Sequence, residues 1–230
     1  MSRSIPNWSL ITENNPKSPI SEGYRMLRTN IEFSTIDQKL QVLMVTSSKP
    51  SEGKSTTCAN LAVAFAQADK KVLLIDADLR KPSQHHIFGK SNRKGLTTAL
   101  FNPQELTSVI QSTGTDNLSV IHAGPTPPNP SELLSSKTMS SLLASTRELY
   151  DVIIIDTPPI MSVTDAQIVA TQSDGVVLVI DSGKVKKEIA QKAKALLDHV
   201  NARLLGVVLN KIDRKHSDTY SYYYGVSNEA

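Results

Sequence analysis

Aromatic residues and cysteine are scarce in this sequence. Aromatics make up 5% of the 230 residues, and Cys58 is the single cysteine. One cysteine excludes an internal disulfide framework and fits a reducing compartment. No apolar run approaches the roughly 20 residues that a transmembrane helix needs, so we expect no membrane span. Lys and Arg total 25 against 22 Asp and Glu. Because this excess is small, we expect no nucleic-acid partner.

The tyrosines are few and unevenly placed. Four of the six lie within the last 11 residues: Tyr220, Tyr222, Tyr223 and Tyr224. The surrounding segment is polar and has no helical periodicity, which predicts a mobile tail over residues 211–230. At the other end, residues 1–20 contain three prolines and few apolar side chains. This composition predicts an extended arm.

Between these ends, short β-branched apolar runs alternate with helix-like stretches. Several runs are continuous rather than alternating, which is typical of strands covered on both faces. The pattern predicts an α/β fold with a doubly wound, mainly parallel sheet, formed by one domain over residues 21–210. Ser21 is the expected N-cap of a first helix over Ser21–Phe33. The expected strands are Val42–Thr46, Val72–Asp76, Leu118–Ile121, Val152–Asp156, Val176–Ile180 and Leu205–Leu209, and the other expected helices are Lys54–Ala68, Ser136–Leu149, Val163–Thr171 and Lys184–Val200.

The strongest chemical signal is SSKPSEGKST, residues 47–56, between the first expected strand and the next helix. Gly53-Lys54-Ser55 matches the end of the phosphate-binding pattern G-x-x-x-x-G-K-[ST], although Ser48 replaces its first glycine. The glycine lets the backbone approach phosphate, and the helix N-terminus offers free N–H groups. The lysine places a cation on the β- and γ-phosphates, and the serine hydroxyl can coordinate Mg²⁺. The expected nucleotide-binding residues of the loop are Ser48, Lys49, Pro50, Ser51, Glu52, Gly53, Lys54, Ser55 and Thr56.

Two apolar strands end in aspartates that we expect to lie near this loop. VLLIDADLR, residues 72–80, supplies Asp76 and Asp78, and VIIIDTPP, residues 152–159, supplies Asp156. Because the carboxyl ends of parallel strands meet at one edge, these carboxylates can place Mg²⁺ and accept a proton from an attacking hydroxyl. The expected catalytic residues are Lys54, Asp76 and Asp78, and the expected metal ligands are Ser55, Asp76, Asp78 and Asp156.

Two further residues have alternative interpretations. Asn210-Lys211-Ile212-Asp213 has the N-K-x-D form that reads guanine in GTPases. In ATP-using relatives of this fold, an asparagine at this place lies near adenine instead. We expect Asn210 to contact the base, and the spacing leaves the base open. Lys49 is either an intersubunit lysine, as in some relatives of this loop, or a solvated loop residue.

Five motifs together resemble the bacterial tyrosine kinases of capsule and exopolysaccharide systems: SSKPSEGKST, LLIDADLRKP, AGPTPPNPSELL, IIIDTPP and the terminal tyrosine cluster. The resemblance implies a P-loop NTPase fold of the partitioning-ATPase-like type. Ser51 stands where the family usually has glycine. The implied activity is an ATP- and Mg²⁺-dependent protein-tyrosine kinase that phosphorylates other proteins and its own Tyr220, Tyr222, Tyr223 and Tyr224. The alternative is a partitioning or division-site ATPase switch that phosphorylates nothing.

The resemblance also implies partners. Glu22-x-x-Arg25-x-x-Arg28, within an oligomerisation helix over residues 21–34, matches the family motif that joins subunits into a ring. Without the resemblance, a solvated helix face is the default interpretation. A membrane adaptor would activate this cytoplasmic chain through its own cytoplasmic tail and recruit it to the inner face of the membrane. A tyrosine phosphatase would counteract the kinase.

Overall fold

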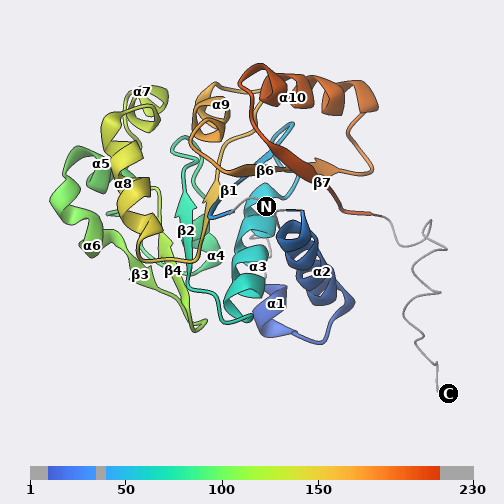
Figure 1. Ribbon diagram of the computed structural model, residues 1–230, viewed down its shortest axis with the longest axis horizontal. Coiled ribbons are helices and arrows are strands. Elements are labelled where there is room, and N and C mark those ends of the chain that lie inside the picture. The colour runs from blue at the N-terminus through green and yellow to red at the C-terminus, as the bar shows by residue number, and fades with distance from the viewer. Residues whose placement is uncertain (1–9, 35–39, 213–230) are drawn as a thin grey trace, which may run out of the picture.

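A computed structural model gives the fold and describes residues 10–34 and 40–212. Its centre is a seven-stranded sheet with the order β3-β4-β2-β5-β1-β6-β7 (Figure 1). All neighbouring strands are parallel except β3, which runs antiparallel to β4. The strands are β1 (Val42–Ser47), β2 (Val72–Asp76), β3 (Gln111–Ser112), β4 (Leu118–Ile121), β5 (Val152–Asp156), β6 (Gly175–Asp181) and β7 (Leu204–Asn210).

Helices cover both faces of the sheet (Figure 1). One layer contains α1 (Ile11–Asn14), α2 (Pro19–Phe33), α3 (Lys54–Ala66) and α4 (Gln84–Ile87). The other contains α5 (Leu96–Phe101), η1 (Pro103–Glu105), α6 (Leu106–Val109), α7 (Pro130–Leu134), α8 (Lys137–Arg147), α9 (Asp165–Ala170) and α10 (Lys187–His199).

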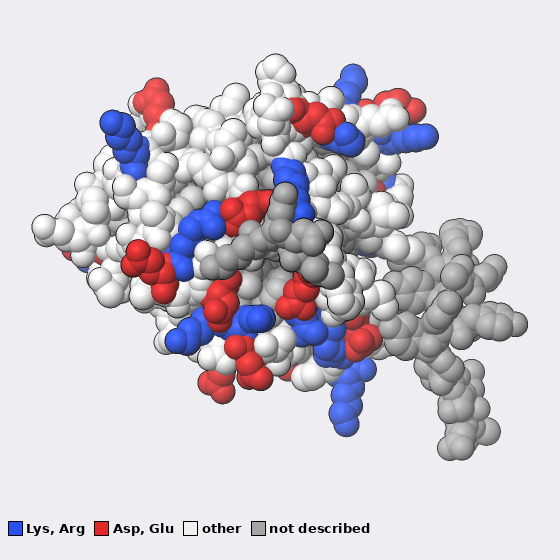
Figure 2. Space-filling model, in the orientation of Figure 1, with Lys and Arg blue, Asp and Glu red and all other residues white. Residues whose placement is uncertain are grey.

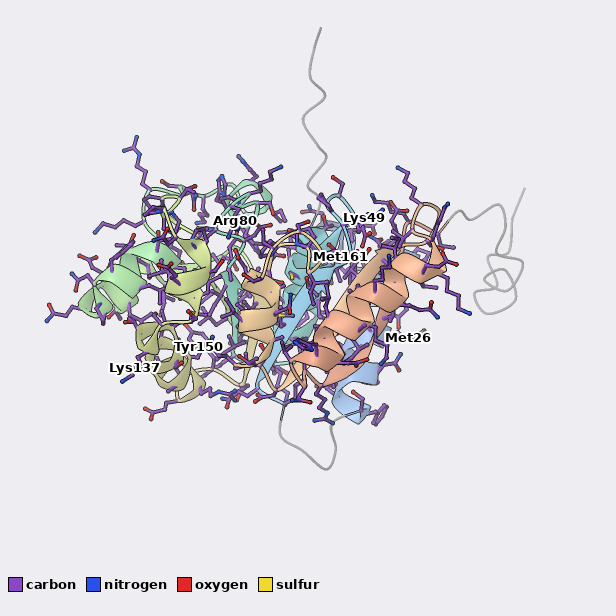
Figure 3. All side chains as sticks on the ribbon, turned by 90° about the horizontal axis from the view of Figure 1, so that it is seen from above. Met26, Lys49, Arg80, Lys137, Tyr150 and Met161 are labelled. Atoms are coloured by element: carbon purple, nitrogen blue, oxygen red, sulfur yellow. The ribbon has the colours of Figure 1, made fainter. Side chains whose placement is uncertain are left out.

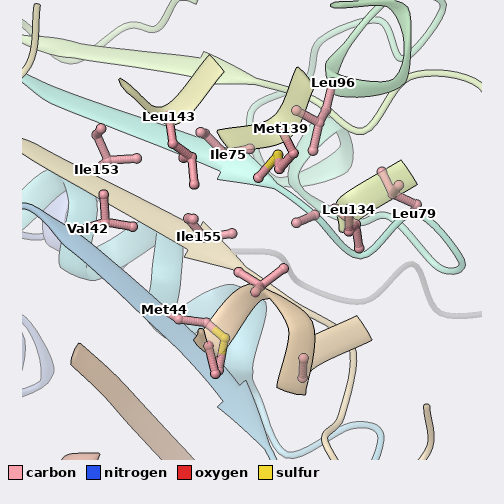
Figure 4. Packing of buried hydrophobic residues seen from close by; sticks show 14 of the residues in the cluster. Val42, Met44, Ile75, Leu79, Leu96, Leu134, Met139, Leu143, Ile153 and Ile155 are labelled. Atoms are coloured by element: carbon pink, nitrogen blue, oxygen red, sulfur yellow. The ribbon is translucent and has the colours of Figure 1, made fainter. Parts of the chain in front are cut away.

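The central strands alternate their side chains between two buried layers. In β5, Ile153 and Ile155 pack in the layer of α8, on the side of Leu143 (Figure 4). Val152 and Ile154 pack in the layer of α3. Every residue of β1, β2, β5 and β6 is buried. Burial of each large apolar side chain contributes about 1.5–3 kcal/mol to folding. The apolar runs are therefore continuous because both faces of these strands are covered.

The predicted fold class, a doubly wound and mainly parallel sheet, is confirmed. The six expected strands and the five expected helices are present, with ends that differ by at most three residues. The antiparallel strand β3 and the short helices α1 and α4–α7 were not expected. Each has six residues or fewer, and such a segment is too short to show a hydrophobic period.

The expected extended arm over residues 1–20 is wrong for its described part, residues 10–20. Leu10 belongs to the core, and Thr12 on α1 is fully buried. The amide and the hydroxyl of Thr12 both donate to Asn60 Oδ1 on α3, at 3.0 and 2.9 Å. This segment is therefore packed against the domain, and the buried Thr12 is bonded to Asn60 on α3.

The N-cap of α2 also differs from the expectation. The helix begins at Pro19, and Ser18 is its N-cap, accepting a hydrogen bond from the backbone of Ser21. Proline is favoured at the first helical position because its missing N–H has no partner there in any case. Ser21 instead donates its hydroxyl to the carbonyls of Ile11 and Asn15.

Within the described residues, no helix is both long and apolar enough to cross a bilayer. Figure 2 shows acidic and basic side chains interspersed over one face, in keeping with the small net charge. The predicted tail lies outside the described residues from residue 213 onward, and so do its four tyrosines.

Candidate active site

The phosphate-binding loop connects β1 to α3, as predicted. β1 ends at Ser47, and α3 begins at Lys54 with Gly53 as its N-cap. Gly53 has a φ of 94°, which lies in the left-handed region that glycine adopts at little cost. A Cβ at Gly53 would also collide with the side-chain amide of Asn210. The backbone conformation therefore favours glycine here, and a larger residue would also have to displace the side-chain amide of Asn210.

The ammonium group of Lys54 lies close to carboxylates that follow or end two neighbouring strands, β2 and β5. Its Nζ is 3.0 Å from Asp78 Oδ2 and 3.4 Å from Asp156 Oδ1, and it donates to Ser55 Oγ at 3.0 Å. Asp76 is the register partner of Asp156 across β2 and β5. The structure thus brings together all five of these side chains, which the sequence places up to 102 residues apart.

The three carboxylates are buried around a single lysine. Burial alone would lower the pKa of Lys54, but the charges of Asp156 and Asp78 raise it above its usual value. Burial and the neighbouring charge of Asp156 raise the pKa of Asp76 to about 8. At neutral pH a carboxyl group with a pKa of about 8 is mostly protonated, and a further cation bound beside these carboxyl groups would favour its ionised form.

Asp76 and Asp78 differ in what their oxygens contact. Asp76 Oδ2 accepts from the backbone of Ser83 and Gln84, and Oδ1 accepts from the backbone of Asp78. In Asp78, Oδ1 accepts from the backbone of Lys81, whereas Oδ2 faces Lys54. Asp76 thus mainly anchors the loop after β2, while Asp78 has an oxygen directed into the site.

Ser48 and Glu52 bind each other inside the loop. The Ser48 amide and hydroxyl donate to the Glu52 carboxylate at 3.0 and 2.7 Å, and both side chains are buried. Burial raises the pKa of Glu52, although the hydrogen bonds from Ser48 act in the opposite sense. The residue that replaces the first glycine of the pattern therefore has a structural partner. Sequence reasoning missed this contact.

The residues at the end of β7 contact the loop backbone. Asn210 Nδ2 donates to the carbonyl of Glu52 at 2.8 Å. Lys211 Nζ donates to the carbonyl of Ser51 at 2.5 Å and lies 3.1 Å from Asp181 Oδ2. In this structure the amide nitrogen of Asn210 is bonded to the protein. The expected contact of Asn210 with the base stays a prediction.

Gln84 is a buried site residue that the sequence analysis did not identify. Its Nε2 donates to Asp156 Oδ2 at 2.8 Å and to the carbonyl of Ser55 at 3.1 Å. It therefore connects β5, α3 and the loop after β2. Its only signal in the sequence is its position eight residues after Asp76, at the start of α4.

Arg80 forms a second unexpected network beside the site. Its guanidinium makes two hydrogen bonds of 2.9 Å to the buried carboxylate of Asp165 on α9. Ser131 on α7 donates to the same carboxylate at 2.7 Å. This network joins the loop after β2 to α7 and α9.

The remaining loop residues are more open. Lys49, Pro50 and Ser51 are exposed, while Thr56 on α3 is half-buried. Lys49 and Arg80 lie toward one side of the molecule, and Tyr150 lies toward the opposite side (Figure 3). The exposure of Lys49 leaves both of its interpretations open.

The charged residues of α2 are paired within their own chain. Glu22 and Arg25 form an ion pair of 2.7 Å, and Arg25 also donates to the carbonyl of Pro16. Arg28 donates to the carbonyl of Ala64 on α3. Their role in a ring stays a prediction.

The described residues contain no group of three or more His, Cys, Asp or Glu side chains spaced to hold a metal. Two surface hollows of about 490 and 550 Å³ lie at the amino edge of the sheet and share Lys71, Leu149 and Tyr150 in their linings. Neither reaches the lysine and carboxylates at the carboxyl edge. The candidate site is therefore identified by its chemistry.

Comparisons with known proteins agree with this site. The ParA family model, described as NUBPL iron-transfer P-loop NTPase, matches residues 38–226. The tyrosine-protein kinase YwqD of Bacillus subtilis is 51% identical over 216 residues, covering 94% of this chain and 91% of that protein.

Two solved structures are also similar. The chimeric protein CapA2B2 is 45% identical, with a TM-score of 0.86, over 89% of this chain and 90% of the other. The kinase domain of the Escherichia coli tyrosine kinase ETK is 35% identical, with a TM-score of 0.87, over 97% of this chain and 88% of the other.

Proposed function

This chain belongs to the ParA-type P-loop NTPases and, among them, to the tyrosine-protein kinases of capsule and exopolysaccharide systems, and we propose that it transfers the γ-phosphoryl group of ATP to its own C-terminal tyrosines. The family prediction and the kinase activity are confirmed by these relatives. The alternative, an ATPase switch without kinase activity, does not fit a chain that is 51% identical to a tyrosine-protein kinase.

The observation that carries the proposal is Lys54, which is 3.0 Å from Asp78 and 3.4 Å from Asp156 at the start of α3. Nucleotide phosphates can take the place of these carboxylates as partners of the ammonium group. The free N–H groups at the start of α3 lie beside them and favour anions. Lys54 then stabilises the negative charge that develops on the transferred group.

Mg²⁺ fits the oxygen donors of the site. Hydroxyl and carboxylate oxygens are its preferred protein ligands, and it usually takes one or two carboxylates together with substrate phosphates. Ser55 and Asp156 are the residues that would hold it, which leaves Asp78 to accept a proton, with Asp76 anchoring the loop after β2. When bound, it neutralises charge on the β- and γ-phosphates. A cage of three carboxylates is not needed for this role.

We assign to Asp78 the role of accepting the proton of the tyrosine hydroxyl. A bond forms between the tyrosine oxygen and the γ-phosphorus, while the bond from that phosphorus to the β–γ bridging oxygen breaks and ADP leaves. The phenol has a usual pKa of about 10, so its proton needs an acceptor. Asp78 Oδ2 faces the site, and the backbone of Lys81 fixes the orientation of the carboxylate through Oδ1.

The acceptors are Tyr220, Tyr222, Tyr223 and Tyr224. The two other tyrosines are poorly placed for transfer within the same chain. Burial raises the pKa of Tyr24 on α2, and Tyr150 lies at the amino edge of the sheet, away from Lys54. A segment that begins just after β7 therefore provides better acceptors, for its own site or for that of a neighbouring subunit.

Three partners complete the proposal. A ring of identical subunits, joined through Glu22, Arg25 and Arg28, would bring each tail to a neighbouring site. A membrane adaptor would activate the kinase through its cytoplasmic tail and recruit it to the inner face of the membrane. A tyrosine phosphatase would remove the phosphate, whose negative charge loosens the ring.

The test is a map of phosphotyrosine after incubation of the full chain with ATP and Mg²⁺, with and without the adaptor's cytoplasmic tail. We expect deletion of residues 220–224 to remove most self-phosphorylation while an added protein substrate is still phosphorylated. The matched controls are Tyr24→Phe and Tyr150→Phe, which should leave the label on the cluster unchanged. Self-phosphorylation that survives the deletion undiminished would contradict the assignment of the acceptors.

A further inference from the structure

The exposed side of the phosphate loop is connected to the ends of β6 and β7. Asp181 is the last residue of β6, and Lys211 directly follows β7. Lys211 Nζ bridges Asp181 Oδ2 and the carbonyl of Ser51, at 3.1 and 2.5 Å. We refer to these three residues as the Lys211 bridge. It contacts the loop two residues before Gly53.

The loop needs such a support because Ser51 has an unfavourable backbone conformation. Its φ is 66°, in the left-handed region that costs a residue with a Cβ about 1 kcal/mol or more. Glycine would adopt this conformation freely. A hydrogen bond from a charged donor is stronger than one between neutral groups, so the ammonium of Lys211 can stabilise the turn at Ser51.

Charge balance also favours this role for Lys211. The side chain of Asp181 is 6% exposed, and its charge is close enough to raise the pKa of Glu52. Glu52 in turn accepts both hydrogen bonds from Ser48. Without a cation, two nearly buried carboxylates would repel each other beneath the loop. Lys211 supplies that cation and directs it to a loop carbonyl.

We propose that Lys211 is a positioning residue that, with Asp181, keeps the phosphate loop in its binding conformation before nucleotide arrives. The proposal rests on the proposed function in one respect, namely that the loop binds ATP. Lys211 itself needs no contact with the nucleotide, because its Nζ is engaged by Asp181 and Ser51.

The first test uses the protein without nucleotide. Lys211→Met should raise the amide hydrogen-exchange rates of residues 48, 49 and 51–53 about tenfold, as expected for the loss of one partly exposed charge-assisted hydrogen bond. Exchange in β1 and β5 and the thermal midpoint should stay as in wild type. Lys211→Arg should restore most of the protection, and Lys192→Met on α10 is the matched surface control. Exchange in Lys211→Met within twofold of wild type would overturn the proposal.

The second test measures nucleotide. Lys211→Met should weaken the binding of a fluorescent ATP analogue about tenfold and raise the KM for ATP similarly, with kcat within twofold of wild type. A fall in kcat at unchanged KM would assign Lys211 to the chemistry and overturn a positioning role. If wild type fails to bind ATP, the proposed function fails, while the exchange experiment still decides the role of Lys211.

A double-mutant cycle tests the link to Ser51. Ser51→Gly removes the backbone strain, so Lys211→Met should then weaken ATP binding only about twofold instead of tenfold. Ser51→Ala keeps the Cβ and is the matched control, with the full tenfold loss expected. Equal losses in the glycine and alanine backgrounds would show that strain at Ser51 is not what Lys211 offsets.

Discussion

Lys54 and Arg147 are cations at opposite edges of the same sheet, and their surroundings differ in charge balance. At the carboxyl edge, Lys54 lies among three buried carboxylates, and the pKa of Asp76 is raised to about 8 by burial and by the charge of Asp156. At the amino edge, the Arg147 guanidinium pairs, within the described part of the chain, with Asp174 alone, through two hydrogen bonds of 2.8 and 2.9 Å.

Asp174 is a carboxylate whose oxygens accept hydrogen bonds from Arg147 and from the backbone. Burial alone would raise its pKa, but the hydrogen bonds from Arg147 and from the backbone of Val42 and Gln41 lower it below its usual value. The ends of β1, β6 and α8 are thereby joined. This pair has no surplus charge, so it stabilises the fold and offers nothing to a ligand.

The difference teaches how to separate a site from a structural pair. Ion pairs at both edges have short distances, so distance alone does not distinguish them. The number of carboxylates around each cation does distinguish them. Buried charges that exceed their partners destabilise a fold, and such clusters are typical of functional sites; here the cluster would hold a nucleotide with its metal.

The largest expected effect comes from removing the cation of the carboxyl edge. Lys54→Met should lower the rate of tyrosine phosphorylation by about a thousandfold, because the charge that develops on the transferred group loses its main protein donor. Circular dichroism should show that the fold is retained. Phosphotyrosine at the wild-type level in this variant would mean that the active site lies elsewhere.

A second prediction concerns His122, which directly follows β4 at the carboxyl edge. Its ring is buried, and neither ring nitrogen has a hydrogen-bond partner among the described residues. Burial, with the charges of His85 and Lys90, lowers its pKa from 6.5 to about 4. The unfolded chain therefore binds a proton below pH 6.5 that the folded chain does not take up until about pH 4.

It follows that stability falls as the pH drops from 7 to 5, with His122 contributing on the order of 1–2 kcal/mol of that loss. In His122→Phe, urea unfolding should show a smaller loss of free energy between pH 8 and pH 5 than in wild type. His199→Phe, on the exposed side of α10, is the matched control and should keep the wild-type loss. Equal losses in wild type and His122→Phe would contradict the prediction.

Much of the site could be predicted because each of its main residues follows a strand. Lys54 comes after β1, Asp76 ends β2 and Asp156 ends β5, and parallel strands bring their carboxyl ends to one edge. A continuous apolar run is enough to locate such a strand end. The sequence therefore predicted the meeting of these side chains without any knowledge of the distances between them.

Other parts depend on contacts that no local pattern encodes. The inward turn of Glu52 toward Ser48 and the bridge from Lys211 to Ser51 require the packed loop. Gln84 lies on a four-residue helix, which is too short to show a period. The arm was mispredicted for the same reason, because its polar residue Thr12 is buried only through a partner on α3.

The smallest expected effect concerns the balanced pair of the amino edge. Arg147→Met should lower the free energy of unfolding by about 1 kcal/mol at pH 7, since both side chains are partly exposed and solvent weakens the pair. Because the pKa of Asp174 is lowered in the folded state, its contribution is present at neutral pH and is lost as the pH falls through that pKa. The destabilisation should therefore shrink as the pH falls through the lowered pKa of Asp174 and the carboxylate becomes protonated. Arg147→Lys is the matched control and should recover only part of the loss, because a lysine lacks the two-pronged geometry.

The rate of tyrosine phosphorylation should stay within twofold of wild type in both variants. A large loss of activity at unchanged stability would show that the two edges are coupled, and charge balance would then no longer separate the structural pair from the site.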